Sequence, residues 1–298
     1  MSIQAFGNYL ALERNYAAHT IRAYLSDLRE FASFCQENFE TEDLEDIAYS
    51  IVRSWLISHM EGGLSGRSIN RKTASLKAYY SYLLRIGRIP LSPLKGHKPI
   101  KSLKKLEIPF SEQEMERLFG SFPKAHTYED MRNQLIVELL YTTGIRRSEL
   151  VNLCFSDFDP GAGILKVIGK RNKERLMPLL KGVVIRFESY LECRKKAFPE
   201  QISNHIFLTG KGNKINDTLV YRIINRYLRE VSDKAKTSPH VLRHTFATHL
   251  LNKGADMNAV KELLGHSSLA STQVYTHNSI AELRRIHEGA HPRNLDET

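Results

Sequence analysis

The sequence predicts a mainly α-helical protein of the α+β class, with two domains and one small antiparallel β-hairpin. Three observations predict this. Apolar residues recur at helical spacing through most of the chain, residues 163–179 alternate as a hairpin does, and a proline- and lysine-rich segment divides the chain near residue 100. The 298 residues are enough for two cores of ordinary size, so neither domain needs a disulfide or a metal ion to fold.

Residues 1–88 are predicted to form a small helical bundle. The second helix has Thr20 as its expected N-cap and an apolar face that extends to Cys35. The fourth helix is expected to carry Arg67, Arg71 and Lys72 on the side away from its apolar face. The four helices are expected at residues 2–14, 20–37, 50–61 and 67–86.

Residues 89–110 are predicted to be a basic linker. Four prolines and five lysines fall between Arg88 and Phe110. Proline blocks the continuation of a helix, and the lysines keep the segment in water or against phosphate groups. Such a connection suits a clamp whose two lobes lie on opposite sides of a DNA duplex.

Residues 111–298 are predicted to form the second domain. It opens with a capping box from Ser111 to Glu114, and its next apolar helix ends at Gly144. The β-hairpin follows, with Lys170 at its tip. Further elements are expected as helices at 181–197 and 216–232, a short strand at 205–209, a helix with Ser238 as cap and Pro239 at its first position, and a shorter helix from Asp256 to Gly265.

Charge and cysteine content indicate the partner and the compartment. The net charge of +10 favours a polyanionic partner, and the surplus lies after residue 97, where 32 basic residues face 23 acidic ones. Three widely spaced cysteines without a C-x-x-C motif indicate a reduced, cytoplasmic protein. We expect no membrane span and no export signal, because no apolar run approaches about 20 residues.

The candidate chemical groups lie mainly in the last 60 residues. His240 and Arg243 are one helical turn apart, His266 follows Gly265, and Tyr275 lies further along. Arg146 comes just after the helix end at Gly144 and is followed three residues later by Glu149. Arginine and histidine donors without a carboxylate cluster suit phosphoryl transfer to a tyrosine oxygen without a metal ion.

A zinc site is the alternative interpretation of the histidine-rich tract. His240 and His244 have the i, i+4 spacing of a helical metal pair. The glutamate of H-E-x-x-H is missing, however, and Arg243 between the two histidines would repel a cation. We therefore expect no metal ion and no other cofactor, and we expect His244 to point into packing or an internal hydrogen bond.

The combination of these motifs resembles the tyrosine recombinases, also called the lambda-integrase family, over nearly the whole chain. TGIRRSEL is similar to the family's first arginine box, VIGKRNKERLMPL to its hairpin lysine motif, HVLRHTFATHLLNKGADMNAVKELLGH to its second box and STQVYTH to its nucleophile motif. The bacterial Xer subgroup fits best, because HTIRAYLSDLREFASF and AHPR are similar to its N-terminal region and its tail. The chain departs from the family at Arg171, where glycine is usual, and at Arg147, which is often apolar.

The resemblance implies a core-binding, SAM-like N-terminal bundle and a mostly helical catalytic domain. It also implies strand exchange through a 3′-phosphotyrosyl intermediate on double-stranded DNA recombination sites, without ATP. The protein would act on DNA as a homotetramer or as a heterotetramer with a paralogous recombinase. A septal DNA translocase would be a further partner. The implied catalytic residues are Arg146, Lys170, His240, Arg243, His266 and the nucleophile Tyr275; the candidate DNA-binding residues are Arg67, Arg71, Lys72, Arg171, Lys173 and Arg175.

Three other functions remain open from the sequence. The nearest is an integrase of a mobile element such as a phage, transposon or integron, in place of an enzyme that resolves chromosome or plasmid dimers. A type IB topoisomerase would use similar chemistry as a monomer. A DNA-binding protein without activity would share the charge but would have no reason to combine Tyr275 with Lys170 and two arginines.

Overall fold

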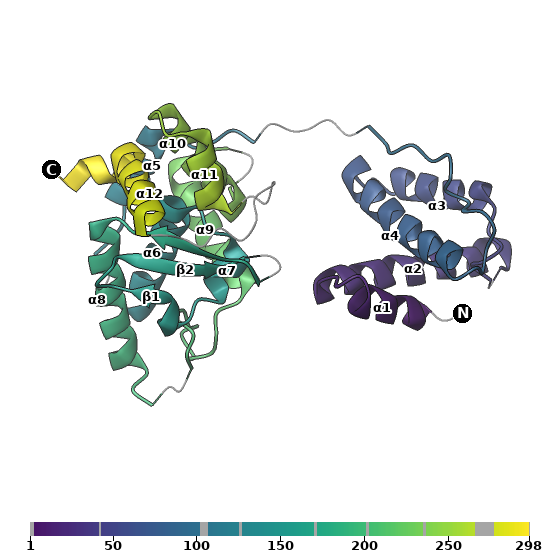
Figure 1. Ribbon diagram of the computed structural model, residues 1–298, viewed down its shortest axis with the longest axis horizontal. Coiled ribbons are helices and arrows are strands. Elements are labelled where there is room, and N and C mark those ends of the chain that lie inside the picture. Colours follow the sequence, from purple (N-terminus) through teal and green to yellow (C-terminus); the bar gives the residue numbers. More distant parts are fainter. Residues whose placement is uncertain are drawn as a thin grey trace. The chain divides into compact units, whose positions relative to one another are not determined.

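The computed structural model describes residues 3–41, 43–101, 107–124, 127–169, 172–200, 203–234, 237–265 and 277–297. The chain divides into two compact units, Met1–Lys105 and Leu106–Thr298, which are coloured purple to blue and blue to yellow in Figure 1. The described residues are mostly helical, with one small antiparallel sheet in the second unit. The predicted α+β class is therefore confirmed.

The first unit is a bundle of four helices, α1 (Ile3–Leu12), α2 (Ala18–Phe39), α3 (Tyr49–Glu61) and α4 (Gly66–Arg85). Their apolar faces meet in a core that contains Phe6, Phe31, Trp55 and Tyr80. The four helices begin and end within a few residues of the predicted positions. The predicted N-cap Thr20 is wrong, because α2 begins at Ala18 and is preceded by extended backbone without a side-chain cap.

The segment between the two cores contributes to both of them. Ile89 and Leu94 are buried in the first core, and Phe110 is buried in the second. Asn70 of α4 also pairs with the backbone of Ile100, donating to its carbonyl at 2.8 Å and accepting from its N–H at 2.9 Å. Apolar residues and one asparagine thus hold residues 89–101 against the helices of the first unit, so this part of the predicted linker belongs to that unit.

The second unit is built around α6 (Tyr128–Thr143), a helix that is buried on nearly every side. The other helices of this unit are α5 (Glu112–Gly120), α7 (Arg147–Val151), α8 (Lys181–Ala197), α9 (Asp217–Val231), α10 (Pro239–Asn252), α11 (Met257–Leu264) and α12 (His277–Ala290), with short 3-10 turns at Phe155–Asp157 and Pro292–Glu297. The predicted capping box is present at the start of α5. Helix α7 was not predicted.

Gly144 ends α6 and redirects the chain toward Arg146. Its φ of 59° lies in the left-handed region, and a Cβ atom here would come within 2.4 Å of the Phe246 ring. Both constraints require glycine at this position. The turn places Arg146 directly before α7, beside the end of the buried helix.

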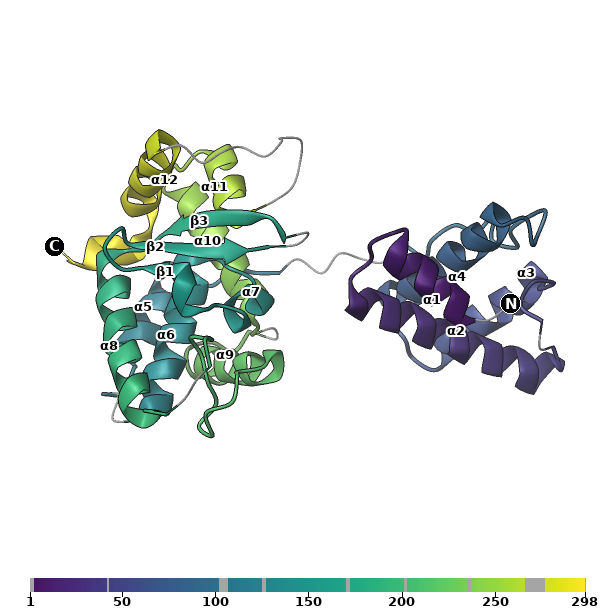
Figure 2. The same cartoon turned by 60° about the horizontal axis from the view of Figure 1, so that its bottom comes forward.

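The sheet has the order β1 (Phe158–Asp159), β2 (Ile164–Ile168), β3 (Glu174–Pro178), and every pair is antiparallel. Strands β2 and β3 form the predicted hairpin, with Ile168 opposite Glu174, while β1 was not predicted. Figure 2 shows the strands side by side, with β3 on the side of α11 and α12. The strand predicted at 205–209 is wrong, because His205 and Leu208 form only isolated bridges.

No helix among the described residues is long and apolar enough to cross a membrane.

Candidate active site

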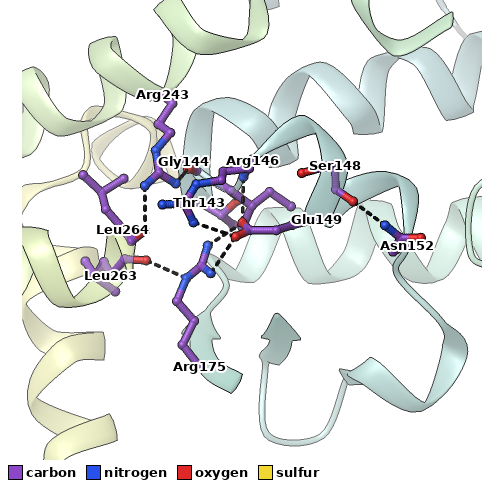
Figure 3. Close-up of polar contacts among 11 residues, drawn as sticks. Thr143, Gly144, Arg146, Ser148, Glu149, Asn152, Arg175, Arg243, Leu263 and Leu264 are labelled. Atoms are coloured by element: carbon purple, nitrogen blue, oxygen red, sulfur yellow. Dashed lines mark hydrogen bonds and ion pairs between the residues drawn. The ribbon is translucent and has the colours of Figure 1, made fainter. Parts of the chain in front are cut away.

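Three arginines from different elements gather around one buried carboxylate. Arg146 lies at the N-terminus of α7, Arg175 on β3 and Arg243 on α10, and the carboxylate belongs to Glu149 of α7. Figure 3 shows the three guanidinium groups converging on Glu149 and on the backbone carbonyls beside it. The fold thus brings together residues nearly 100 positions apart.

Glu149 fixes Arg146 by two bonds. The Arg146 backbone N–H donates to Oε2 at 2.8 Å, and its Nη1 donates to Oε1 at 2.8 Å. The carboxylate is only 4% exposed, while the Arg146 side chain is 37% exposed. Because a guanidinium has five N–H donors, Arg146 can donate to Glu149 and still offer other donors to a ligand on its exposed side. The sequence located Glu149 but gave it no role.

Arg243 is held by backbone carbonyls at two positions. Its Nη1 donates to the carbonyl of Gly144 at 2.6 Å, and its Nη2 donates to the carbonyl of Leu264 at 2.6 Å. Arg243 as a whole residue is 7% exposed. Arg243 therefore links the C-terminal ends of α6 and α11. Because backbone carbonyls are uncharged, these two bonds do not neutralise its positive charge.

Arg175 is a structural neighbour of the two candidate catalytic arginines. It forms a fork with Glu149, Nη1 to Oε1 at 3.1 Å and Nη2 to Oε2 at 2.7 Å, and its Nε donates to the carbonyl of Leu263 at 3.0 Å. Its side chain is 5% exposed. A signal in the sequence could have indicated this burial, since Arg175 shares a strand face with the apolar Met177.

The balance of charge in the cluster favours an anion. Burial alone would raise the pKa of Glu149, but the bonds from Arg175 and Arg146 lower it, so the group is a carboxylate. Burial, followed by repulsion from Arg146 and Arg175, lowers the pKa of Arg243 to about 10. Three guanidinium groups gather around this one carboxylate, and a bound phosphate would relieve their mutual repulsion.

The three histidines of α10 have different surroundings. His240 is 75% exposed, and its Nε2 lies 3.7 Å from Oε2 of Glu107. His249 is buried, with Nδ1 2.9 Å from the Tyr141 hydroxyl and Nε2 2.8 Å from the carbonyl of Phe110. His244 is exposed, so its predicted inward orientation is wrong. His240 and His244 are thus both exposed, and His240 is the one that lies one helical turn from Arg243.

Four predicted site residues lie outside the described residues: Lys170, Arg171, His266 and Tyr275. The structure does describe the elements that flank them in the chain. Strands β2 and β3 flank Lys170 and Arg171, and the Gly169 N–H donates to the Lys173 carbonyl at 2.7 Å. Gly265 ends α11 with a φ of 63°, directly before His266.

The remaining DNA-binding candidates divide into exposed and buried side chains. Arg67 and Lys173 are exposed. Arg71 is half exposed and forms a fork with the buried carboxylate of Asp27, at 2.5 and 3.0 Å. The predicted outward orientation of Lys72 is wrong, because its side chain is 8% exposed and lies between Asp27 and Glu30.

Comparison with known proteins identifies the family. Residues 3–87 match the N-terminal SAM-like domain of phage integrases, and residues 98–282 match the phage integrase family. The chain belongs to the phage integrase family. It is 36% identical to the tyrosine recombinase XerC of Chlorobaculum parvum, over 97% of this chain and 94% of that one, and 39% identical to XerC of Staphylococcus aureus strain JH9, over 97% and 96%. The chain is therefore a site-specific tyrosine recombinase of the Xer subgroup, as its motifs indicated.

Solved structures have the same fold. The Tn1549 transposon integrase in complex with circular intermediate DNA aligns with a TM-score of 0.70 and 22% identity, over 95% of this chain and 98% of that one. The XerH recombinase in a post-cleavage complex with a palindromic difH substrate aligns with a TM-score of 0.66 and 23% identity, over 99% and 83%. At these identities the likeness concerns the fold.

Proposed function

We propose that the arginine cluster is the phosphate-binding part of the active site and that Tyr275 is the nucleophile. The observation that carries this proposal is the gathering, among the residues that the structure describes, of three guanidinium groups around the carboxylate of Glu149. A scissile phosphodiester would bind to Arg146 and Arg243, whose forked donors match the non-bridging oxygens better than a lysine would. The cluster would stabilise the extra negative charge of the transition state in the same way.

The chemical step would be an in-line displacement. The Tyr275 oxygen forms a bond to phosphorus and loses its proton, and the bond from phosphorus to the 5′ oxygen breaks. Lys170 gives a proton to the departing 5′ oxygen, and the products are a 3′-phosphotyrosyl enzyme and a free 5′-hydroxyl. Rejoining to another 5′-hydroxyl reverses these steps, so the reaction needs no ATP.

The two histidines would assist at the phosphate. His240 would accept the tyrosine proton or orient the phosphate, and the exposure of its side chain supports this role because it leaves the imidazole accessible to DNA. His266 would add a hydrogen bond to a phosphate oxygen. A phenol with a pKa near 10 is a weak nucleophile, and the cationic pocket would favour the phenolate.

A nicked suicide substrate tests this assignment. Cleavage beside the nick releases a short fragment and traps the protein on DNA as a covalent adduct. We expect the adduct with the wild-type protein and none with Tyr275→Phe, although the variant should bind DNA nearly as tightly, because phosphate contacts dominate the affinity. An adduct with Tyr275→Phe would refute the choice of nucleophile.

The biological role we propose is the resolution of chromosome or plasmid dimers during chromosome partition at cell division, in the cytoplasm. The 36–39% identity to XerC proteins over nearly the full length supports this role. Exchange of four strands would require four protomers on two DNA sites, as a homotetramer or together with a paralogous recombinase. A septal DNA translocase would be the activating partner, and Arg67, Arg71 and Lys173 would contact the DNA backbone.

Sequencing of DNA captured as covalent adducts in cells would distinguish this role from that of a mobile-element integrase. Dimer resolution predicts one recurrent chromosomal or plasmid site. Capture at the ends of a mobile element would instead support the integrase alternative.

A further inference from the structure

Arg175 has contacts that neither a DNA-binding role nor a simple core role explains. The residue lies on β3, yet its side chain is buried and all three of its guanidinium nitrogens donate to protein oxygens. Two of these bonds go to Glu149, the carboxylate that also holds Arg146. Arg175 is therefore linked to Arg146 through the Glu149 carboxylate that both of them bind.

We infer that Arg175 is a positioning residue for DNA cleavage, which occupies the Glu149 carboxylate and so keeps the charge of Arg146 available for the scissile phosphate. The inference rests on the proposed function of the cluster.

The geometry at Glu149 supports this competition for one carboxylate. Arg175 takes both oxygens in a fork, whereas the side chain of Arg146 donates to Oε1 alone, at 2.8 Å. Forked arginine–carboxylate pairs are stronger than single bonds. Without Arg175, the Arg146 guanidinium could take the fork itself. Its charge would then be neutralised by Glu149 rather than by DNA.

The bond from Arg175 to α11 adds a second constraint. Arg175 binds the carbonyl of Leu263, and Arg243 binds the carbonyl of the next residue, Leu264. These two bonds fix the end of α11 relative to β3 and α10. Arg175 thus links β3 to both α7 and α11, at a site where a shift of about 1 Å can cost about 10²-fold in rate.

The test measures single-turnover cleavage of the nicked substrate and, separately, DNA affinity. We expect Arg175→Gln to slow cleavage by about 10²-fold while the Kd for DNA changes by less than about threefold, because the side chain does not reach the surface. Arg194→Gln is the matched control: Arg194 is similarly buried and donates to the carbonyls of Ser203 and His205, away from the cluster. The control should cleave at close to the wild-type rate.

A double variant separates positioning from mere support of the fold. In Arg175→Gln the unneutralised Glu149 captures Arg146, so adding Glu149→Gln should restore cleavage by about tenfold. If the double variant is no faster than Arg175→Gln, the inference is wrong. A large loss of DNA affinity in Arg175→Gln would also overturn it, since that outcome would mean a direct DNA contact.

Arg175→Lys keeps the test decisive if Arg175→Gln fails to fold. Lysine preserves the buried charge but cannot hold both Glu149 oxygens and the Leu263 carbonyl, so we expect about tenfold slower cleavage with a folded protein. Cleavage at the wild-type rate by Arg175→Lys would overturn the inference. Failure of the proposed function would look different, because the wild-type protein itself would then form no adduct.

Discussion

Each unit contains a buried aspartate or glutamate that holds two cationic side chains, and the two clusters differ in their balance of charge. In the first unit, Asp27 binds Arg71 and Lys72, and Lys72 also binds Glu30, so two cations face two carboxylates. In the second unit, three guanidinium groups gather around the carboxylate of Glu149. In the first unit the charges of the named groups balance, whereas in the second unit Arg146 and Arg175 repel the guanidinium group of Arg243.

A structural ion network and a phosphate site can be told apart by their balance of charge. A buried cation is tolerated when carboxylates neutralise it, and the network then contributes to the fold. Where positive charge exceeds negative charge in a partly buried site, the free protein retains repulsion that a ligand can relieve. The lowered pKa of Arg243, caused by burial and by two neighbouring arginines, is a sign of that repulsion.

Removal of the Arg243 guanidinium group should have the greatest consequence of the changes considered. Arg243→Gln should slow cleavage by about 10³-fold, because loss of one preorganised donor to a transition-state oxyanion costs about 10² to 10³ and a full charge is lost as well. DNA affinity should fall only modestly. Single-turnover cleavage and equilibrium binding measure the two quantities. A variant that loses its fold instead would show that the bonds to Gly144 and Leu264 are the main role of Arg243.

The second effect concerns the neutral network of the first unit. Asp27→Asn should destabilise that unit by about 3 kcal/mol, since it leaves Arg71 and the buried Lys72 without their shared carboxylate. Cleavage of DNA at saturating concentration should be almost unchanged. Hydrogen exchange of α2 and α4 amides reports the stability. Glu61→Gln, at an exposed glutamate of the first unit, is the control, and equal effects of the two changes would contradict the prediction.

Acidification should lower the stability of the second unit through the titration of His287. Burial lowers the pKa of His287 to about 4, while an unfolded histidine titrates near 6.5, so the unfolded chain binds more protons between these values. The stability due to neutral His287 is complete above pH 6.5 and is lost as the pH falls toward 4. At about 1.4 kcal/mol per pH unit, the titration of His287 alone should remove about 2 kcal/mol of stability from the second unit between pH 6.5 and 5.

His287→Gln provides the control for this titration. Glutamine can still donate to the Thr142 carbonyl that His287 contacts at 2.6 Å, but it does not titrate. Its stability curve should therefore be flatter than that of the wild type. Hydrogen exchange of α6 amides at several pH values measures both curves, and parallel curves would contradict the assignment.

The sequence was sufficient to predict what depends on local pattern. Apolar periodicity located the helices within a few residues, alternation located the β2–β3 hairpin, and the capping box at Ser111 marked the start of α5. Gly144 was recognised as a helix end because only a residue without a side chain is favoured at its positive φ. The family motifs added the candidate catalytic residues, of which Arg146 and Arg243 lie together in the structure.

The remaining features depend on contacts between distant segments. The helical spacing of α10 places His249 on its buried face, but its hydrogen-bond partner, the carbonyl of Phe110, comes from a segment far away in the chain that no pattern within α10 indicates. Lys72 is buried because Asp27 and Glu30 of another helix supply its partners. A basic residue in a basic sequence favours a surface position, so Arg175 was assigned to DNA and its partner Glu149 to no role.

Binding of a small anion is the most direct test of the charge balance in the arginine cluster. Millimolar sulfate, a small mimic of phosphate, should stabilise the second unit by about 1.4 kcal/mol at ten times its Kd and should leave the first unit unchanged. Chloride at equal ionic strength controls for screening, and Arg243→Gln controls for sites elsewhere. Hydrogen exchange of both units provides the measurement. If sulfate protects both units equally, or protects Arg243→Gln as well as the wild type, then the excess of arginine over carboxylate does not define an anion site.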